Sequence, residues 1–164
     1  MPITGGCRCG TIRYDIALDA LPSVYACHCL DCQTWSGSAF ALHAMLPDDL
    51  LALDRDAHCF RIDEVEQMPS EHLGCARCMT RIANRNSAVP GMIILRAGTM
   101  DRSDEIIPVA HIWTRRAQPW VTLPEGVPAF GETPTPEQFQ TVLSKSGAAA
   151  IKRGSTSLAA ASVI

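Results

Sequence analysis

The chain has 164 residues, of which 47% are apolar, and a formal net charge of −3. A chain of about 150 residues buries roughly 70% of its unfolded surface, so this length suffices for one domain with a core. Basic and acidic residues are mixed, which argues against a nucleic-acid-binding surface. No apolar run approaches the ~20 residues of a membrane-spanning helix, and no signal peptide is evident. We therefore expect a cytoplasmic protein without membrane or nucleic-acid partners.

Short runs with β-strand character follow one another, separated by Gly, Pro, Asp and Asn. Residues 11–18 come first, and there Tyr14 and Ile16 belong to an apolar set that alternates with polar residues. In the next run, Phe40, Leu42 and Ala44 are predicted to share one face. Residues 47–54 indicate a turn or a single helical turn. That run covers residues 38–46. The later strand candidates are residues 58–63, 92–101, 107–114 and 119–124.

One stretch has the pattern of a helix. Thr135 can cap it, Pro136 suits its first position, Gln138 completes a capping box and Gly147 ends it. We therefore predict a single mainly β domain over residues 1–147 with one short C-terminal helix, followed by a flexible tail over residues 148–164.

Eight cysteines are unexpected in a cytoplasmic chain. They occur as Cys7-x-Cys9, Cys27-x-Cys29-x-x-Cys32, a lone Cys59 and Cys75-x-x-Cys78. Disulfides would suit an exported chain, but a reducing cytosol does not maintain them, whereas thiolates held by a metal persist there. We interpret the cysteines as metal ligands, and keep the disulfide alternative for export.

The cysteine groups divide into four ligands and three. Side chains at positions i and i+2 of a strand share a face, and a Cys-x-x-Cys turn brings two sulfurs to one ion. The set of four can complete a tetrahedral zinc site that contributes to folding: Cys7, Cys9, Cys75 and Cys78. The set of three leaves an open position, which is typical of a catalytic zinc: Cys27, Cys29 and Cys32.

Other arrangements remain open at this point. Cys59 can complete the set of three, which would make both sites structural, although a lone buried cysteine is common in cores. Alternatively, the N-terminal Cys-x-Cys pair joins Cys27 and Cys29, which leaves Cys32 without a site. Strand alternation directs His28 away from the sulfurs, so a surface role or a role behind the ligands is favoured over ligation.

These motifs resemble the glutathione-dependent formaldehyde-activating enzyme family. The matching stretches occur in family order over residues 4 to 124: GGCRCGTIRY, CHCLDCQTWSGSAF, CARC, PGMIILRAGTMD and HIWTRRAQPW. The resemblance implies a zinc β-tent fold of small antiparallel sheets. It also implies two zinc ions per chain, a structural one on Cys7, Cys9, Cys75 and Cys78 and a catalytic one on Cys27, Cys29 and Cys32. One departure is Met79, which stands where the family usually has glycine, so an altered turn is expected.

By this resemblance the reaction joins glutathione and formaldehyde into S-hydroxymethylglutathione, a carbon–sulfur lyase step in reverse. We expect a zinc enzyme acting on a small thiol and aldehyde; the alternative is a non-enzymatic β-tent binding module with two structural zincs. A homodimer is plausible through exposed strand edges.

Several residues are candidates for the substrate site, each with a structural alternative. Trp35 can line a pocket or pack in the core, residues 36–38 can bind an anion or form a turn, and His111 can act as a base or as a structural histidine. Trp113 and Trp120 are expected in the core or a groove. The candidate partners for substrate carboxylates are Arg13, Arg81, Arg85 and Arg96.

Overall fold

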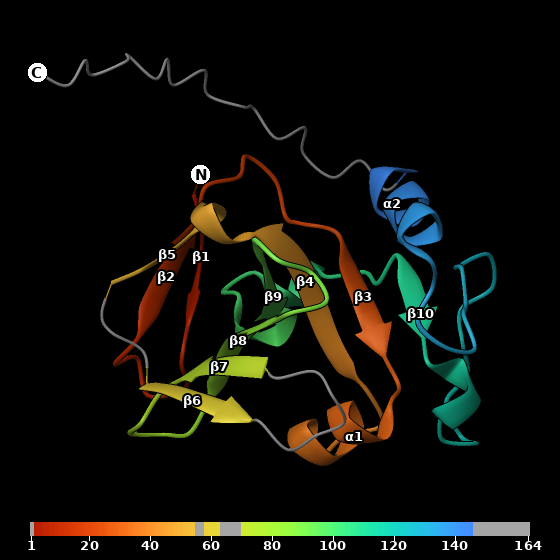
Figure 1. Ribbon diagram of the computed structural model, residues 1–164, viewed down its shortest axis with the longest axis horizontal. Helices are drawn as coiled ribbons and strands as arrows, with labels where there is room; N and C mark the ends of the chain where they lie inside the picture. The colour runs from red at the N-terminus through yellow and green to blue at the C-terminus, as the bar shows by residue number, and fades with distance from the viewer. Residues whose placement is uncertain (1, 55–57, 63–69, 146–164) are drawn as a thin grey trace, which may run out of the picture.

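The computed structural model describes residues 2–54, 58–62 and 70–145, and of residues 58–62 and 145 it describes only the backbone. The described chain is mainly β, with two sheets and two α-helices (Figure 1). This confirms the predicted fold class. The predicted tail over residues 148–164 and the predicted helix end at Gly147 lie outside the described residues.

The smaller sheet has three strands in the order β1-β2-β5, and both pairs are antiparallel. Its strands are β1 (Ile3–Gly6), β2 (Arg13–Ile16) and β5 (Leu51–Leu53). The alternation in residues 11–18 is confirmed, because Tyr14 and Ile16 are buried and Asp15 between them is exposed. Gly5 lies opposite Tyr14, where a Cβ would collide with the tyrosine ring and the Thr99 carbonyl.

The larger sheet has seven strands in the order β10-β3-β4-β9-β8-β7-β6. Only the β10–β3 pair is parallel among the strand pairs of the described chain. The strands are β3 (Val24–Cys27), β4 (Ala41–Pro47), β6 (His58–Ile62), β7 (Ser70–Gly74), β8 (Arg81–Asn86), β9 (Met92–Arg96) and β10 (Ala110–Ile112).

The main core lies between the two sheets and takes side chains from both. From the larger sheet, Leu42, Ala44 and Leu46 of β4 join it. His43, between them, belongs to the opposite face of this strand. The prediction for this strand therefore holds for Leu42 and Ala44, whereas Phe40 precedes the strand and packs against His28 with 5.2 Å between ring centroids.

Two helices complete the described fold: α1 (Leu30–Ser36) and α2 (Pro136–Lys145). The capping box of α2 forms as predicted, since Gln138 N donates to Thr135 Oγ1 at 3.3 Å and Thr135 N donates to Gln138 Oε1 at 2.9 Å. Phe139 then packs edge-on against Tyr25 of β3, with 4.8 Å between the ring centroids. Sequence patterns missed α1, which is short and buries none of its residues.

The remaining strand predictions differ in outcome. Residues 58–63 and 92–101 contain β6 and β9, and residues 107–114 form only the short strand β10. Residues 47–54 form a single 3₁₀ turn, Asp48–Leu50, followed by β5. The strand predicted over residues 119–124 is wrong; this segment begins and ends with prolines, which lack the amide hydrogen that a sheet ladder needs.

Candidate metal centres

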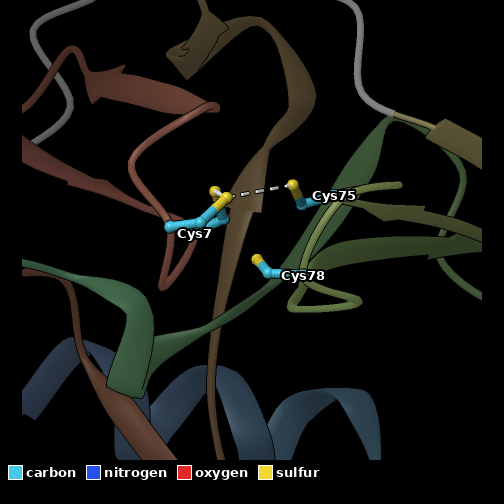
Figure 2. Close-up of side chains that lie close together, drawn as sticks. Cys7, Cys75 and Cys78 are labelled. Carbon is cyan, nitrogen blue, oxygen red and sulfur yellow. Dashed lines mark hydrogen bonds between the residues drawn. The ribbon is translucent and has the colours of Figure 1, made fainter.

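Four of the predicted ligands meet between β1 and β7. The four-cysteine cluster consists of Cys7, Cys9, Cys75 and Cys78, whose sulfurs all lie within 4.8 Å of one another. Cys7 and Cys9 have their sulfurs 3.5 Å apart, and those of Cys9 and Cys75 are 3.7 Å apart. Four sulfurs at about 2.3 Å from one zinc ion would be roughly 3.8 Å apart, so the spacing fits a tetrahedral site. Figure 2 shows the two halves of this cluster converging from distant parts of the chain.

The turn between Cys75 and Thr80 holds the second half of the cluster. The Met79 amide donates to the Cys75 carbonyl at 2.8 Å, and the Cys75 amide donates to the Thr80 carbonyl at 2.9 Å. Met79 has φ of 59°, the left-handed conformation that glycine adopts readily. The turn therefore closes around methionine, whose side chain is exposed. Hydrogen bonding by Thr80 lowers the pKa of Cys78 to about 5, which favours the thiolate that a metal binds.

The other three predicted ligands, the cysteine trio Cys27, Cys29 and Cys32, meet where β3 leads into α1. Their sulfurs also lie within 4.8 Å of one another. Cys29 is the N-cap of α1, and its sulfur accepts a hydrogen bond of 3.4 Å from the Cys32 amide. The expected tight turn is therefore a helix start. Hydrogen bonds from the thiols of Cys27 and Cys32, and then from backbone amides, lower the pKa of Cys29 to about 2.

The structure tests two of the three alternative cysteine arrangements. The N-terminal pair lies with Cys75 and Cys78, so its proposed grouping with Cys27 and Cys29 is wrong. The seven cysteines whose side chains are described are all free, which also removes the disulfide alternative for them. The side chain of Cys59 lies outside the described residues, so its closing of the trio stays a hypothesis.

Basic and amide side chains from β4, β8 and β9 lie beside the trio. His43 has its Nε2 3.3 Å from the sulfur of Cys32, and Arg96 Nη1 is 2.9 Å from both His43 ring nitrogens. Arg96 Nη2 lies 3.5 Å from Asn84 Oδ1. Burial, and then the charges of Arg96 and Arg81, lower the pKa of His43 to about 3, so this imidazole is neutral at physiological pH.

A second basic side chain near Cys32, Arg81, comes from β8, which pairs with β9 on the side opposite β4. Arg81 of β8 has its Cζ 3.3 Å above the ring of Trp35 in α1. Its Nη2 lies 3.0 Å from His72 Nδ1, and His72 Nε2 lies 2.8 Å from Ser70 Oγ. Trp35 also stacks on the His72 ring, with 4.6 Å between the centroids. Trp35 is therefore neither core nor free surface, because it ties α1 to β7 and β8.

The sequence matches one protein-family model over most of its length. The model for the glutathione-dependent formaldehyde-activating enzyme matches residues 2–116, which include all seven clustered cysteines. The chain belongs to this family. A search of curated proteins finds no match. The structure resembles a structural-genomics crystal structure of a Rhodobacter sphaeroides protein with a TM-score of 0.49, 16% identity, and coverage of 64% of this chain and 97% of that one.

Zinc suits both sulfur clusters of this family member. Thiolates are the soft ligands that zinc prefers, and the compact sulfur groups match its size. The four-cysteine cluster can fill a tetrahedron, whereas the trio, among the side chains that the structure describes, offers one ligand fewer. The structure thus contains two groups of side chains able to hold metal ions.

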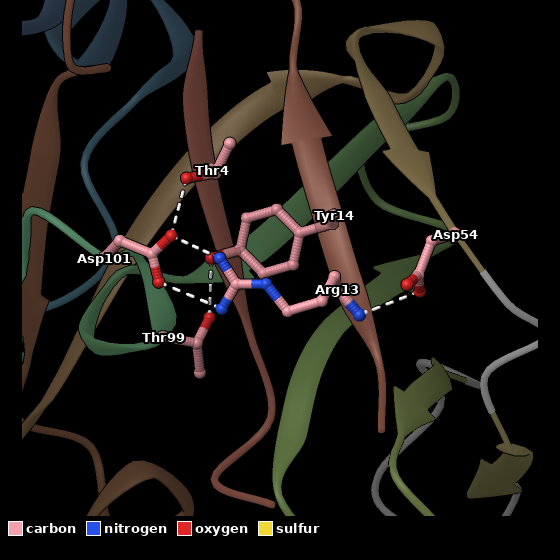
Figure 3. A network of polar contacts seen from close by, with 6 residues as sticks. All are labelled: Thr4, Arg13, Tyr14, Asp54, Thr99 and Asp101. Atoms are coloured by element: carbon pink, nitrogen blue, oxygen red, sulfur yellow. Dashed lines mark hydrogen bonds and ion pairs between the residues drawn. The ribbon is translucent and has the colours of Figure 1, made fainter. Parts of the chain in front are cut away.

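Two of the four candidate arginines are already paired with carboxylates away from the trio. Arg13 forms an ion pair with the Asp101 carboxylate, and its backbone amide donates to Asp54 Oδ1 at 2.8 Å (Figure 3). Arg85 donates to Asp48 at 2.8–3.0 Å and also contacts Glu71. Neither charge is left over for a substrate.

The candidate anion-binding segment, residues 36–38, has a structural role. Residues 36–38 close α1: Gly37 is left-handed with φ of 62°, and Ser36 Oγ donates to the Cys32 carbonyl at 2.7 Å. The turn interpretation of this segment is therefore the better one.

Two histidines form a buried pair behind the trio. His28 Nε2 lies 3.0 Å from His111 Nδ1, and burial lowers the pKa of both rings. His28 is not part of the sulfur group and contacts His111 instead, but it is buried rather than on the surface.

The two later tryptophans also differ from each other. Trp113 is partly buried and donates through Nε1 to Thr133 Oγ1 at 3.0 Å. Trp120 is 72% exposed, so the prediction of a core position is wrong for it.

Sequence reasoning missed His43, His72 and Asn84 as neighbours of the site. Each lies on a strand whose partners come from elsewhere in the chain, so no local spacing marks it. Within the described residues, no helix is long and apolar enough to cross a membrane.

Proposed function

We propose that the chain is a zinc-dependent enzyme of the carbon–sulfur lyase type. It joins a small thiol, glutathione or a relative, to a small aldehyde, formaldehyde or a relative, at the cysteine trio. The contrast between the two clusters supports this proposal: among the side chains that the structure describes, one gathers four sulfurs and the other gathers three. Cysteine-held metal ions suit a reducing compartment, so we place the protein in the cytoplasm.

Zinc held by the trio would supply an open coordination position that favours the thiolate form of an incoming thiol, which is its nucleophilic form. The protein side chains set the environment of that position. Cys29 and Cys32 are half-buried, whereas Cys27 is buried, so we expect the incoming thiol to approach on the side of Cys29 and Cys32. Arg96 Nη1 lies 2.9 Å from both ring nitrogens of His43, and His43 Nε2 lies 3.3 Å from the Cys32 sulfur, so the two side chains hold that ligand in place.

The reaction requires one proton transfer. The new bond joins the thiol sulfur to the aldehyde carbon, and the thiol proton ends on the oxygen of the product hydroxyl. His43 is a poor proton acceptor because its pKa is about 3, and the His28–His111 pair is buried. We therefore assign the transfer to solvent water at the half-buried side of the trio.

The exchange rate between formaldehyde and its glutathione adduct tests the function. Exchange spectroscopy by NMR measures this rate against the spontaneous one. We expect the zinc-loaded protein to accelerate exchange, and Cys32→Ser to abolish the acceleration with an unchanged circular dichroism spectrum. Asp104→Asn, at an exposed position of the 3₁₀ turn Ser103–Glu105 and outside both sulfur clusters, is the control that should retain the acceleration. An exchange rate equal to the spontaneous one with fully zinc-loaded protein would contradict the proposal.

The second candidate function is a binding module with two closed structural sites. It requires a fourth protein ligand for the trio, and Cys59 is the remaining cysteine. Cys59→Ser should leave two zinc ions per chain if the trio is open. Loss of the second zinc ion in this variant, measured by mass spectrometry of the native protein, would favour the closed site instead.

A further inference from the structure

Arg81 carries a charge that no described carboxylate neutralises. Of the four candidate arginines, Arg13 and Arg85 have carboxylate partners. Arg81 and Arg96 have none among the described residues, although both are half-buried. Two cations that lie close together and partly out of water disfavour each other. Burial, followed by the charge of Arg96, lowers the pKa of Arg81 to about 9, so it is still charged at neutral pH.

The negative charge of a metal-loaded trio explains why one of these two arginines has no carboxylate partner. Three thiolates around one Zn²⁺ carry a net charge of about −1. Arg96 interacts favourably with all three thiolates, whereas Arg81 interacts with Cys32 alone. Arg96 is therefore the natural counter-charge of the metal centre. The charge of Arg81 has no such counter-charge, and it lies beside Trp35, which is 38% exposed.

The guanidinium of Arg81 is held in a fixed orientation with hydrogen-bond donors unused. Trp35 covers one face, and His72 accepts from Nη2. Because a guanidinium can only donate, Nδ1 of His72 is the acceptor, and the contact of its Nε2 with Ser70 Oγ at 2.8 Å holds the ring in place. The Nε–H is buried without a hydrogen-bond partner, and Nη2 is the only Arg81 donor engaged within the described chain, which leaves Nη1 as the donor for a ligand. A planar guanidinium with free donors is suited to a carboxylate.

We propose that Arg81 is the carboxylate-binding residue of the substrate site, so that the preferred thiol carries a carboxylate near its sulfur. This inference rests on the proposed function, because it takes the sulfur of that thiol to bind at the trio. The aromatic face of Trp35 and the imidazole of His72 act as positioning groups for Arg81. Small mercapto-carboxylates belong to this substrate class; in glutathione, whose cysteine carboxyl is part of a peptide bond, the glycine carboxylate would be the group bound.

A matched pair of thiols tests the assignment by binding rather than by activity. Titration calorimetry of the zinc-loaded protein compares 3-mercaptopropionate with its amide, which has the same size and no charge. A charge-assisted hydrogen bond corresponds to about tenfold or more in affinity, so wild type should prefer the carboxylate by at least that factor. In Arg81→Gln the ratio should fall to about one, because the amide side chain keeps a similar length without the charge.

Arg85→Gln is the matched control, since Arg85 lies on the same strand but is already paired with Asp48. It should keep the wild-type preference. Any intrinsic difference between the two thiols cancels when variants are compared. If Arg81 only fastens α1 to the sheet, Arg81→Gln would lower the melting temperature and leave the preference intact, which would overturn the proposal.

The outcomes separate this proposal from the function on which it rests. Equal affinities of wild type for both thiols would eliminate the carboxylate subsite and leave thiol binding at the trio standing. Failure of both thiols to bind zinc-loaded wild type would eliminate the proposed function and the subsite with it.

Discussion

At the scale of single residues, the three-dimensional structure shows the backbone conformation of Met79 and the partners of each arginine, neither of which can be predicted from the sequence. The cysteine spacings identified which sulfurs gather, because Cys-x-Cys and Cys-x-x-Cys bring ligands together over short distances. The four arginines looked alike in sequence. They separate only in three dimensions, since the partners of Arg13 and Arg85 are carboxylates from distant segments, Asp101 and Asp48.

Met79→Gly is expected to stabilise the protein. A left-handed conformation costs a non-glycine residue roughly 1–2 kcal/mol, and the added flexibility of unfolded glycine returns about 0.5–1 kcal/mol of that. The free energy of unfolding in a urea titration should therefore rise by about 0.5–1 kcal/mol. Met79→Ala is the control, because it removes the exposed side chain and keeps the backbone strain; it should be close to neutral. A less stable Met79→Gly would show that this turn does not need a left-handed residue.

At the scale of secondary-structure elements, some segments carry a local sequence signal and others do not. β2 alternates buried and exposed residues and was found, whereas all four residues of β3 are buried and give no alternation. Helix α2 carries its own capping signals, but α1 is seven residues long and begins at a cysteine. The site depends on α1 and β3, so its lining could not be placed in advance.

Thr135→Ala should loosen helix α2. The substitution removes the side-chain acceptor of the capping box, which costs about 1 kcal/mol. Amide hydrogen exchange should speed up in α2 and stay unchanged in the central strands β4 and β9. Thr141→Ala on the same helix lacks a capping role and is expected to be neutral or slightly stabilising. Equal effects of the two substitutions would argue against the capping box.

The four-cysteine cluster joins the β1–β2 hairpin to the turn between β7 and β8. Cys78→Ser removes one ligand and should weaken metal binding and folding together, because the site is assembled only in the folded chain. We expect loss of the cooperative thermal transition, followed by circular dichroism. Cys32→Ser, in the trio, should retain that transition. A cooperative Cys78→Ser protein that holds two zinc ions would contradict the structural role.

At the scale of the whole molecule, one face of the large sheet builds the core and the opposite face builds the site. The core face packs against the smaller sheet, while the face that carries His43 and Arg96 receives α1 and the trio. Stability and chemistry are thereby assigned to different sides of the same strands. This division explains how a site rich in cations and thiolates can coexist with a dry apolar core.

The large sheet ends at β6 and β10, and β10 is partly covered by a bridge between His111 and Ala129. No strand of the described chain pairs with the outer edge of β6. An uncovered edge can pair with a second copy, so we retain the prediction of a homodimer. Light scattering should give about twice the chain mass of 17.7 kDa; a mass equal to one chain would contradict it.

The open position of the trio is the claim on which the function depends, and cobalt spectroscopy tests it directly. Co²⁺ bound to thiolates has a sulfur-to-cobalt charge-transfer band that strengthens with each added sulfur ligand. We predict that 3-mercaptopropionate intensifies this band in cobalt-substituted wild type and leaves it unchanged in Cys32→Ser. An unchanged wild-type spectrum at saturating thiol, with two cobalt ions bound per chain, would contradict the account.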